Sequence, residues 1–213
     1  MNHRLRVMSM TPRMVRPAVG LTLLAAFALA ATTLVRPAAA GPKTVVSVLA
    51  ARSSLDGFDS RGSDYDILIK AVQTADLVDA LNDPDAKLTV FAPNDAAFMR
   101  TAKSLGFGGG SEEETWNFLV TALTGLGDGD PIPVLKNILL YHVAPERLGP
   151  VKVILSGEIN TLLDETFGVK LLQLVDKDPQ LPNPYLNPFA LNINAGKSVI
   201  HGITRVLLPV DVP

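Results

Sequence analysis

Few side chains in this sequence could perform chemistry, and most of those are acidic. Only two histidines, His142 and His201, follow residue 40, and the chain has no cysteine. A structural zinc site takes four protein ligands and a catalytic one takes three, so two histidines would need carboxylates to complete either site. We therefore expect both imidazoles to make hydrogen bonds in the core, and we expect neither to be a metal ligand.

The aspartates that could bind a cation lie in two loops. One set comprises Asp56, Asp59, Asp64 and Asp66, and the other comprises Asp128 and Asp130. Carboxylate oxygens suit Ca²⁺, but neither set has the alternating acid spacing of an EF-hand loop, which ends in a bidentate glutamate at position twelve. We expect these acids to form turns in contact with water. Ca²⁺ binding stays open as the alternative.

Enzymatic motifs are missing from the sequence. It contains no cysteine nucleophile, no G-x-S-x-G, no H-E-x-x-H and no P-loop. The glycine-rich run at 106–110 follows an expected helix, whereas a dinucleotide-binding loop follows a strand. We therefore predict no catalytic residue, no cofactor-binding residue and no enzymatic activity.

Residues 1–40 resemble a secretory signal peptide. Four arginines precede an apolar run at 18–35, and three alanines end the segment at position 40. A basic part, an apolar part and an A-x-A end are typical of a cleaved signal, here cut after Ala40. An uncleaved anchor is the alternative, because the apolar run approaches the length of a membrane span. With cleavage, residues 41–213 would form a single exported domain, secreted or periplasmic, that is not an integral membrane protein.

The net charge argues against nucleic acid as a partner. The chain has 19 Lys and Arg against 21 Asp and Glu, and five of the arginines lie before residue 41, where there is no acid. Cleavage would thus change the formal net charge from −2 to −7. A negative domain is a poor binder of nucleic acid and of anionic membrane surfaces. Without cysteine, the domain must be stable on its hydrophobic core alone.

Helical periodicity dominates the first half of the sequence. Ser63 or Asp64 is expected to cap the second helix. Ser111 and Glu114 form a capping box for the fourth, whose three first-turn acids are expected to face water. From their apolar spacing we expect helices at 45–51, 64–81, 94–105, 111–124 and 134–145.

After residue 148 the hydrophobic pattern is typical of strands. Four prolines between 179 and 188 make the segment 176–188 a loop or an irregular sheet edge. Helices early and strands late predict an α+β domain rather than alternating βαβ units. The expected strands are short and lie at 151–155, 161–163, 169–175, 191–194 and 198–208.

Residues 88–98, Leu-Thr-Val-Phe-Ala-Pro-Asn-Asp-Ala-Ala-Phe, form the most distinctive stretch. We expect a buried strand at 88–92 that ends at Pro93, because proline has no N–H to donate to a sheet. Asn94 or Asp95 can then cap the next helix, and Phe98 turns inward. The stretch therefore predicts a corner between a strand and a helix.

Residues 88–98, residues 139–143 with the sequence Leu-Leu-Tyr-His-Val, and residues 199–209 together resemble the fasciclin domain family. With the connecting helices, the resemblance covers about residues 43–209. It implies a compact β-wedge packed with several α-helices, in which the matching residues are mainly structural. We predict that the strand at 88–92 lies beside the strand at 199–208, with His142 close to them. The matching residues are Thr89, Phe91, Pro93, Asn94, Asp95 and Phe98 in 88–98, Tyr141 and His142 in 139–143, and His201 in 199–209.

The resemblance also implies cell adhesion, or binding to an extracellular matrix or surface, without enzymatic activity. The sequence Arg-Gly-Ser-Asp at 61–64 differs from Arg-Gly-Asp by an inserted serine, so integrin binding does not carry over. We expect an extracellular or cell-envelope protein or glycan as partner.

Tyr185 in the proline-rich segment and Phe189 directly after its last proline are possible interface residues. Packing of both rings against the sheet edge is the alternative. A second function also stays open: some similar algal proteins bind carotenoids, and the apolar helices here could line a groove for a carotenoid or lipid.

Overall fold

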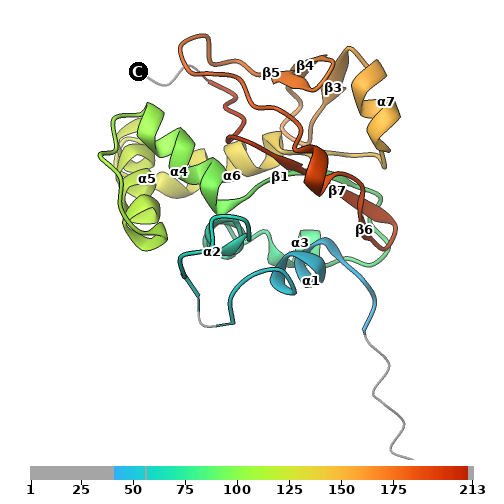
Figure 1. The fold of residues 1–213 in the computed structure, drawn as a ribbon, viewed down its shortest axis with the longest axis horizontal. Helices are drawn as coiled ribbons and strands as arrows, with labels where there is room; N and C mark the ends of the chain where they lie inside the picture. The colour runs from blue at the N-terminus through green and yellow to red at the C-terminus, as the bar shows by residue number, and fades with distance from the viewer. Residues whose placement is uncertain (1–40, 56, 211–213) are drawn as a thin grey trace, which may run out of the picture. The chain divides into compact units, whose positions relative to one another are not determined.

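A parallel pair of strands from distant parts of the sequence lies at the centre of the fold. The computed structural model describes residues 41–55 and 57–210, so the expected signal peptide lies outside the described residues. Strand β1 (Thr89–Pro93) pairs with β7 (Ser198–Ile203), in register from Thr89 opposite Val199 to Pro93 opposite Ile203. The predicted neighbourhood of these two segments is confirmed (Figure 1). The last strand is shorter than expected, and β1 ends at Pro93.

Two further strands complete this sheet, in the order β2-β1-β7-β6. Strand β2 (Val143–Ala144) runs antiparallel to β1, and β6 (Ile193–Ala195) runs antiparallel to β7. The turn between β6 and β7 depends on Gly196, whose φ is +72° and whose N–H donates to the side chain of Asn194. The strand predicted at 191–194 is present only as Ile193–Ala195, since Asn192 has a positive φ of 54°, and the turn after it is confirmed.

The second sheet differs most from expectation. It contains β3 (Glu158–Asn160), β4 (Thr166–Lys170) and β5 (Gln173–Val175) in sequential order. The predicted strand at 161–163 is wrong, because those residues form the turn after β3. The predicted single strand at 169–175 is instead a hairpin, because Leu171 has a positive φ of 57° that reverses the chain.

Residues 151–155 are helical rather than extended. Helix α7 (Pro150–Leu155) begins with Pro150 in its first turn, where the missing N–H costs nothing and the fixed φ suits a helix. The β-branched residues after it therefore gave a misleading strand signal.

The early helices cover one side of the central sheet. The stripe predicted as one helix at 64–81 is interrupted by Asp76, which has a φ of +55°, so it divides into α2 and α3. Helix α6 begins at Pro131, three residues before the expected start at 134. The bounds of the helices are α1 Val45–Ala50, α2 Asp66–Thr74, α3 Val78–Leu81, α4 Asp95–Ser104, α5 Glu112–Leu126 and α6 Pro131–Tyr141.

Strand β1 is buried on both faces and separates two apolar cores. Val90 and Ala92 belong to the core formed with the helices, whereas Phe91 belongs to the core beneath the second sheet. This division follows from the alternation of side chains along a strand. The ring of Phe91 meets that of Phe167 edge to face, with centroids 5.1 Å apart. In Figure 1 the second sheet and α7 accordingly lie on one side of the β1–β7 pair, and α1, α2 and α3 lie on the other.

Among the residues that the structure describes, no helix is both long and apolar enough to span a membrane.

Candidate functional site

The corner at 88–98 is held by two acceptors that serve different helices. The side-chain oxygen of Asn94 accepts the N–H of Ala97 at 2.9 Å, as an N-cap of α4 does. Asp95 instead accepts the N–H groups of Asp66 and Ile67, at 3.1 and 2.8 Å, at the start of α2. The predicted capping of α2 by Ser63 or Asp64 is therefore wrong. Its first N–H groups bond to a carboxylate nearly thirty residues away.

Thr89 joins β1 to the segment that follows β2. Its hydroxyl donates to the carbonyl of Glu146 at 2.6 Å and accepts the N–H of Leu148 at 2.7 Å. The Thr89 side chain is fully buried, and its bond with the N–H of Leu148 forms away from water. Thr89 thus has a structural role.

His142 is a neutral structural residue. Its Nδ1 lies 2.7 Å from the carbonyl oxygen of Ile138, and its Nε2 lies 2.9 Å from the backbone nitrogen of Leu207. A carbonyl can only accept and an amide can only donate, so the proton must be on Nδ1. Burial lowers the pKa of His142 from 6.5 to about 4, because the charged form loses its hydration. The imidazole links α6 to the C-terminal segment.

His201 plays a similar part with the opposite tautomer. Its Nε2 donates to the carbonyl of Leu148 at 2.9 Å, and its Nδ1 accepts the N–H of Asn192 at 3.2 Å. Burial lowers its pKa as well. The two imidazoles lie in separate hydrogen-bond pairs with backbone groups, and neither belongs to a possible metal-binding group among the described residues.

Tyr141 lies in the core beneath the second sheet, and Phe98 lies in the helical core. The Tyr141 hydroxyl donates to the carbonyl of Thr166 at 2.9 Å, and its ring packs edge to face against Phe167. Burial raises the pKa of the Tyr141 phenol. Phe98 packs in the helical core. These residues position the sheets and the helices and expose no reactive group.

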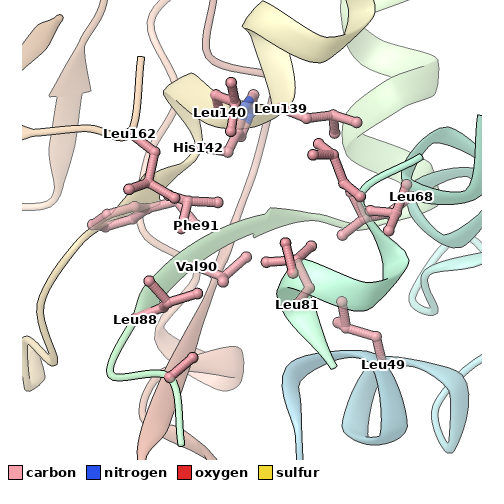
Figure 2. A pocket seen from close by; sticks show the side chains of 15 residues that line it. Leu49, Leu68, Leu81, Leu88, Val90, Phe91, Leu139, Leu140, His142 and Leu162 are labelled. Atoms are coloured by element: carbon pink, nitrogen blue, oxygen red, sulfur yellow. The ribbon is translucent and has the colours of Figure 1, made fainter. Parts of the chain in front are cut away.

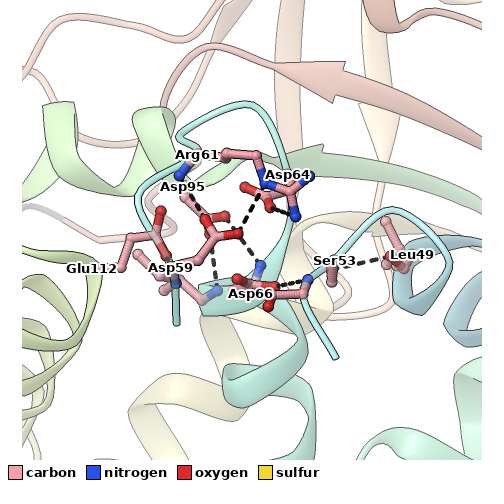
Figure 3. A network of polar contacts seen from close by, with 10 residues as sticks. Leu49, Ser53, Asp59, Arg61, Asp64, Asp66, Asp95 and Glu112 are labelled. Atoms are coloured by element: carbon pink, nitrogen blue, oxygen red, sulfur yellow. Dashed lines mark hydrogen bonds and ion pairs between the residues drawn. The ribbon is translucent and has the colours of Figure 1, made fainter. Parts of the chain in front are cut away.

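Acidic side chains form a cluster beside the corner at 88–98, where α2, α4 and α5 begin. Figure 3 shows the carboxyl groups turned toward one another, with a single guanidinium at the edge. Glu112 is 2% exposed, so the expectation that all three first-turn acids of α5 face water is wrong for this residue. The carboxyl groups belong to Asp59, Asp64, Asp66, Asp95 and Glu112, and the guanidinium belongs to Arg61.

Burial shifts the acid–base equilibria of three of these groups. It raises the pKa of Asp95 to about 8, and the neighbouring carboxyl groups add to the shift. Burial also raises the pKa values of Asp66 and Glu112, and charge repulsion within the cluster adds to both shifts. No local pattern indicated that Glu112 would join the loop acids, because it lies 46 positions after Asp66 and only the fold brings them together.

The other acidic loop does not form such a cluster. Asp130 caps α6 through a bond from the N–H of Ile132 at 3.0 Å, and Asp128 has a φ of +51° in the turn before it. Neither appears in a possible metal-binding group within the described ranges. These two aspartates form a turn, as expected.

The two aromatic residues of the proline-rich segment face solvent to different degrees. Phe189 is 99% exposed and Tyr185 is 49% exposed. Packing of the Phe189 ring against the sheet edge is therefore excluded. Tyr185 lies beside β5 through a backbone bridge with Gln173, and its own ring is half-buried.

The helical core contains an apolar cavity of about 200 Å³. Figure 2 shows leucines from several helices and from the segment before β1 around it. Leu68, Leu81 and Leu139 line it on the helical side, and Val90 lines it from β1. Among the described residues that line it, His142 has the one polar side chain, and both of its ring nitrogens already have partners.

The sequence profile of the fasciclin domain matches residues 63–209, well over half of the chain. The chain belongs to the fasciclin domain family. Its structure is similar to that of a FAS1 domain pair from the insect cell adhesion molecule fasciclin I, with 17% sequence identity and a TM-score of 0.53. The similarity covers 78% of this chain and 51% of that one, so this chain spans about half the length of the pair. At this identity the likeness concerns the fold alone. A search of curated proteins gave no match.

The family match confirms the resemblance based on the three signature stretches and the α+β fold expected from it. Fasciclin domains are generally non-catalytic and occur in extracellular or surface proteins, where they are associated with adhesion or surface interaction.

Proposed function

We propose that this fasciclin domain is exported and binds a protein or a glycan outside the cell or in the cell envelope, through the proline-rich segment. The main support for this proposal is the exposure of Phe189, a large aromatic residue that is 99% exposed. Aromatic residues contribute strongly to interface energies because they bury much apolar area on binding. A ring with no packing role in the fold is a ready anchor for a partner.

The backbone beneath this ring is firmly attached to the central sheet. The N–H of Asn187 donates to the carbonyl of Gly202 at 2.8 Å, and the side chain of Asn187 accepts the N–H of Phe189 at 3.1 Å. Tyr185 exchanges two bonds with Thr204, through its N–H and its carbonyl. A rigid backbone lowers the entropy cost of binding, so the segment is suited to recognition.

Close packing further limits movement of the segment. Phe189 lies in a short 3₁₀ helix, η1 (Pro188–Ala190). A Cβ placed on Gly202 would lie 2.6 Å from the Cβ of Ala190, so this helix rests directly on β7. The aromatic surface, defined here as Tyr185 and Phe189, is therefore a fixed part of the domain.

Binding can be tested by affinity capture from the extracellular fraction of the source cells. Wild-type protein, Phe189→Ala and Leu55→Ala would serve as baits. Leu55 is a matched control, because it is also 99% exposed but lies in a different loop. We expect Phe189→Ala to lose the captured partner and Leu55→Ala to retain it. Equal capture by all three baits would refute the role of the aromatic surface.

Export can be tested separately by N-terminal sequencing of the protein from culture medium or periplasm. We expect the exported form to begin at Gly41. A chain that retains residues 1–40 and stays with the membrane would show an uncleaved anchor instead.

A carrier of a small apolar ligand is a second candidate, and the apolar cavity favours it. Dry apolar cavities of similar size accept small hydrocarbons. Its volume of about 200 Å³ is below the roughly 300–1,000 Å³ of typical ligand sites, so a lipid fragment fits better than a whole carotenoid. Solvent extraction and mass spectrometry of protein from its native source would test this. Protein free of lipid and colour would refute it.

A further inference from the structure

The acidic cluster has the spacing of an ion site. Two groups of three carboxyl groups, Asp59–Asp64–Asp66 and Asp64–Asp95–Glu112, each offer ligand oxygens that lie within 4.8 Å of one another. Oxygens bound to one Ca²⁺ at 2.3–2.6 Å can be at most about 5 Å apart, so either group can surround a single ion. Asp64 belongs to both groups, which places it at the centre.

Several buried oxygens in this cluster have no hydrogen-bond donor. Both carboxyl oxygens of Asp64, Oδ2 of Asp66 and Oε1 of Glu112 accept no hydrogen bond from the described residues. These three side chains are only 5%, 5% and 2% exposed. Buried polar groups are nearly always paired, and a buried carboxylate oxygen without a partner is costly. The unpaired oxygens therefore point to a ligand.

The remaining oxygens show that the cluster is otherwise well organised. Oδ1 of Asp66 accepts the N–H of Ser54 at 2.7 Å, and Oε2 of Glu112 accepts the N–H of Asp59 at 2.8 Å. Asp95 accepts two N–H groups of α2, as described above. Each of these carboxyl groups is thus fixed by backbone donors, and the free oxygens of Asp66 and Glu112 are held in place.

One guanidinium is too little positive charge for five carboxyl groups. Nε of Arg61 lies 2.9 Å from Asp59, and its Nη2 lies 3.5 Å from Asp64. The Arg61 side chain is 65% exposed, so water weakens its attraction, and among the buried oxygens only Oδ2 of Asp64 has it as an ion-pair partner. The helix N-termini that meet here favour negative charge, but they do not supply a partner for Asp64.

We propose that Asp64, Asp66, Asp95 and Glu112, with Asp59 at the rim, bind one Ca²⁺ ion. The donors are all oxygens, which select hard cations over zinc or copper. Ca²⁺ accepts six to eight oxygens in irregular geometry, and Asp64 can offer both of its own, whereas Mg²⁺ requires a near-ideal octahedron. This inference replaces the expectation from sequence of solvated acids, and it is independent of the proposed binding surface.

The ion would connect segments that are far apart in the sequence. It would join the loop at 59–64 to the first turns of α2, α4 and α5. The loop already lies on α4, because the N–H of Ala96 donates to the carbonyl of Gly62 at 2.8 Å and that of Asp95 to the carbonyl of Asp64 at 3.1 Å. An open depression lined by Ser54, Phe58 and Asp66 gives an ion a route from solvent. Bound Ca²⁺ would stabilise the folded state and restrain the loop.

Calorimetry and thermal unfolding of the full-length protein test the proposal. Protein stripped with a chelator would be titrated with CaCl₂ and, separately, with MgCl₂. We expect one saturable Ca²⁺ site, weaker Mg²⁺ binding and a Tm that rises with Ca²⁺ concentration, because a ligand of the folded state stabilises it. Absence of Ca²⁺ heat together with an unchanged Tm would overturn the proposal. Equal or tighter binding of Mg²⁺ would overturn the choice of ion.

Two isosteric variants locate the site. Asp64→Asn and Glu112→Gln keep the side-chain volume, and glutamine at 112 can still accept the N–H of Asp59. We expect each to lose at least tenfold in Ca²⁺ affinity, while Asp64→Asn raises the Tm in chelator because it removes repulsion. Glu113→Gln is the matched control: it removes the same charge from the next, exposed position and should bind as wild type does. Wild-type affinity in both Asp64→Asn and Glu112→Gln would refute the assignment.

Discussion

The structure predicts that His142 makes the domain sensitive to acid. The folded state holds this imidazole neutral, because Nε2 must accept the N–H of Leu207 and cannot do so when protonated. Its pKa is about 4 in the folded state, against 6.5 when it is free of burial. Between these values the unfolded chain binds a proton that the folded chain does not. The free energy of unfolding therefore decreases as the pH falls from about 6.5 toward about 4.

The size of the effect follows from the gap between the two pKa values. A gap of this size corresponds to about 3 kcal/mol once the pH is below both values. Since the side chain is only 3% exposed, solvent screening reduces this little. Three kcal/mol is a large share of the roughly 5–15 kcal/mol that stabilises an ordinary domain.

Replacement His142→Gln separates this contribution from every other titrating group. Glutamine can accept the N–H of Leu207, but it does not titrate. At pH ~7 we expect the variant to be less stable by about 2 kcal/mol, from the lost bond to Ile138 and the lost ring packing. As the pH falls, wild type loses the additional His142 contribution and the variant does not. The two stability curves should therefore converge or cross.

Urea unfolding at a series of pH values, with a chelator present throughout, measures this difference. The buried carboxyl groups affect both proteins equally, so they cancel in the comparison. If the two curves run parallel from pH ~7 to pH ~4.5, His142 does not titrate as its hydrogen bonds require, and the assigned tautomer is wrong.

Three further substitutions test the corner and the surface. Asn94→Ala removes the cap from the N–H of Ala97 and should lower the free energy of unfolding by about 1 kcal/mol in urea titration. Thr89→Val keeps the shape but removes the partner of the buried N–H of Leu148 and of the carbonyl of Glu146, so a loss of about 2 kcal/mol is expected; an unchanged urea midpoint would contradict it. Phe189→Ala should change stability by less than about 0.5 kcal/mol in thermal unfolding, since its ring packs against nothing, and a larger loss would mean that the ring is part of the fold.

Local signals explain which parts of the fold could be predicted. The capping box of Ser111 and Glu114 depends on residues three apart, and the structure contains both of its bonds. Asn94 likewise caps the helix that starts next to it. The pairing of the strands at 88–92 and 199–208 came from the family resemblance, since no local pattern specifies a partner more than a hundred residues away.

The errors arose where local preference and tertiary contacts disagree. Residues 151–155 have strand-forming side chains, but Pro150 favours the start of a helix, and α7 packs on the second sheet. Asn94 caps the helix beside it, as expected of Asn94 or Asp95, whereas Asp95 bonds to the start of α2, where Ser63 or Asp64 was expected as the cap. Glu112 was expected to be exposed to solvent, because charged side chains in the first turn of a helix usually are. Only the approach of three helix starts buries it.

The central pairing of β1 with β7 also determines when the domain can fold. The N–H of Leu88 donates to the hydroxyl of Ser198 at 3.0 Å, across a sequence separation of 110 residues. Contacts this distant form slowly, because the entropy of closing a long loop is lost before the contacts contribute any stabilising free energy. A nascent chain that has not yet reached residue 198 lacks β7, and without it β1 cannot be buried on both faces. The central sheet therefore cannot form until the chain has been synthesised to about residue 203.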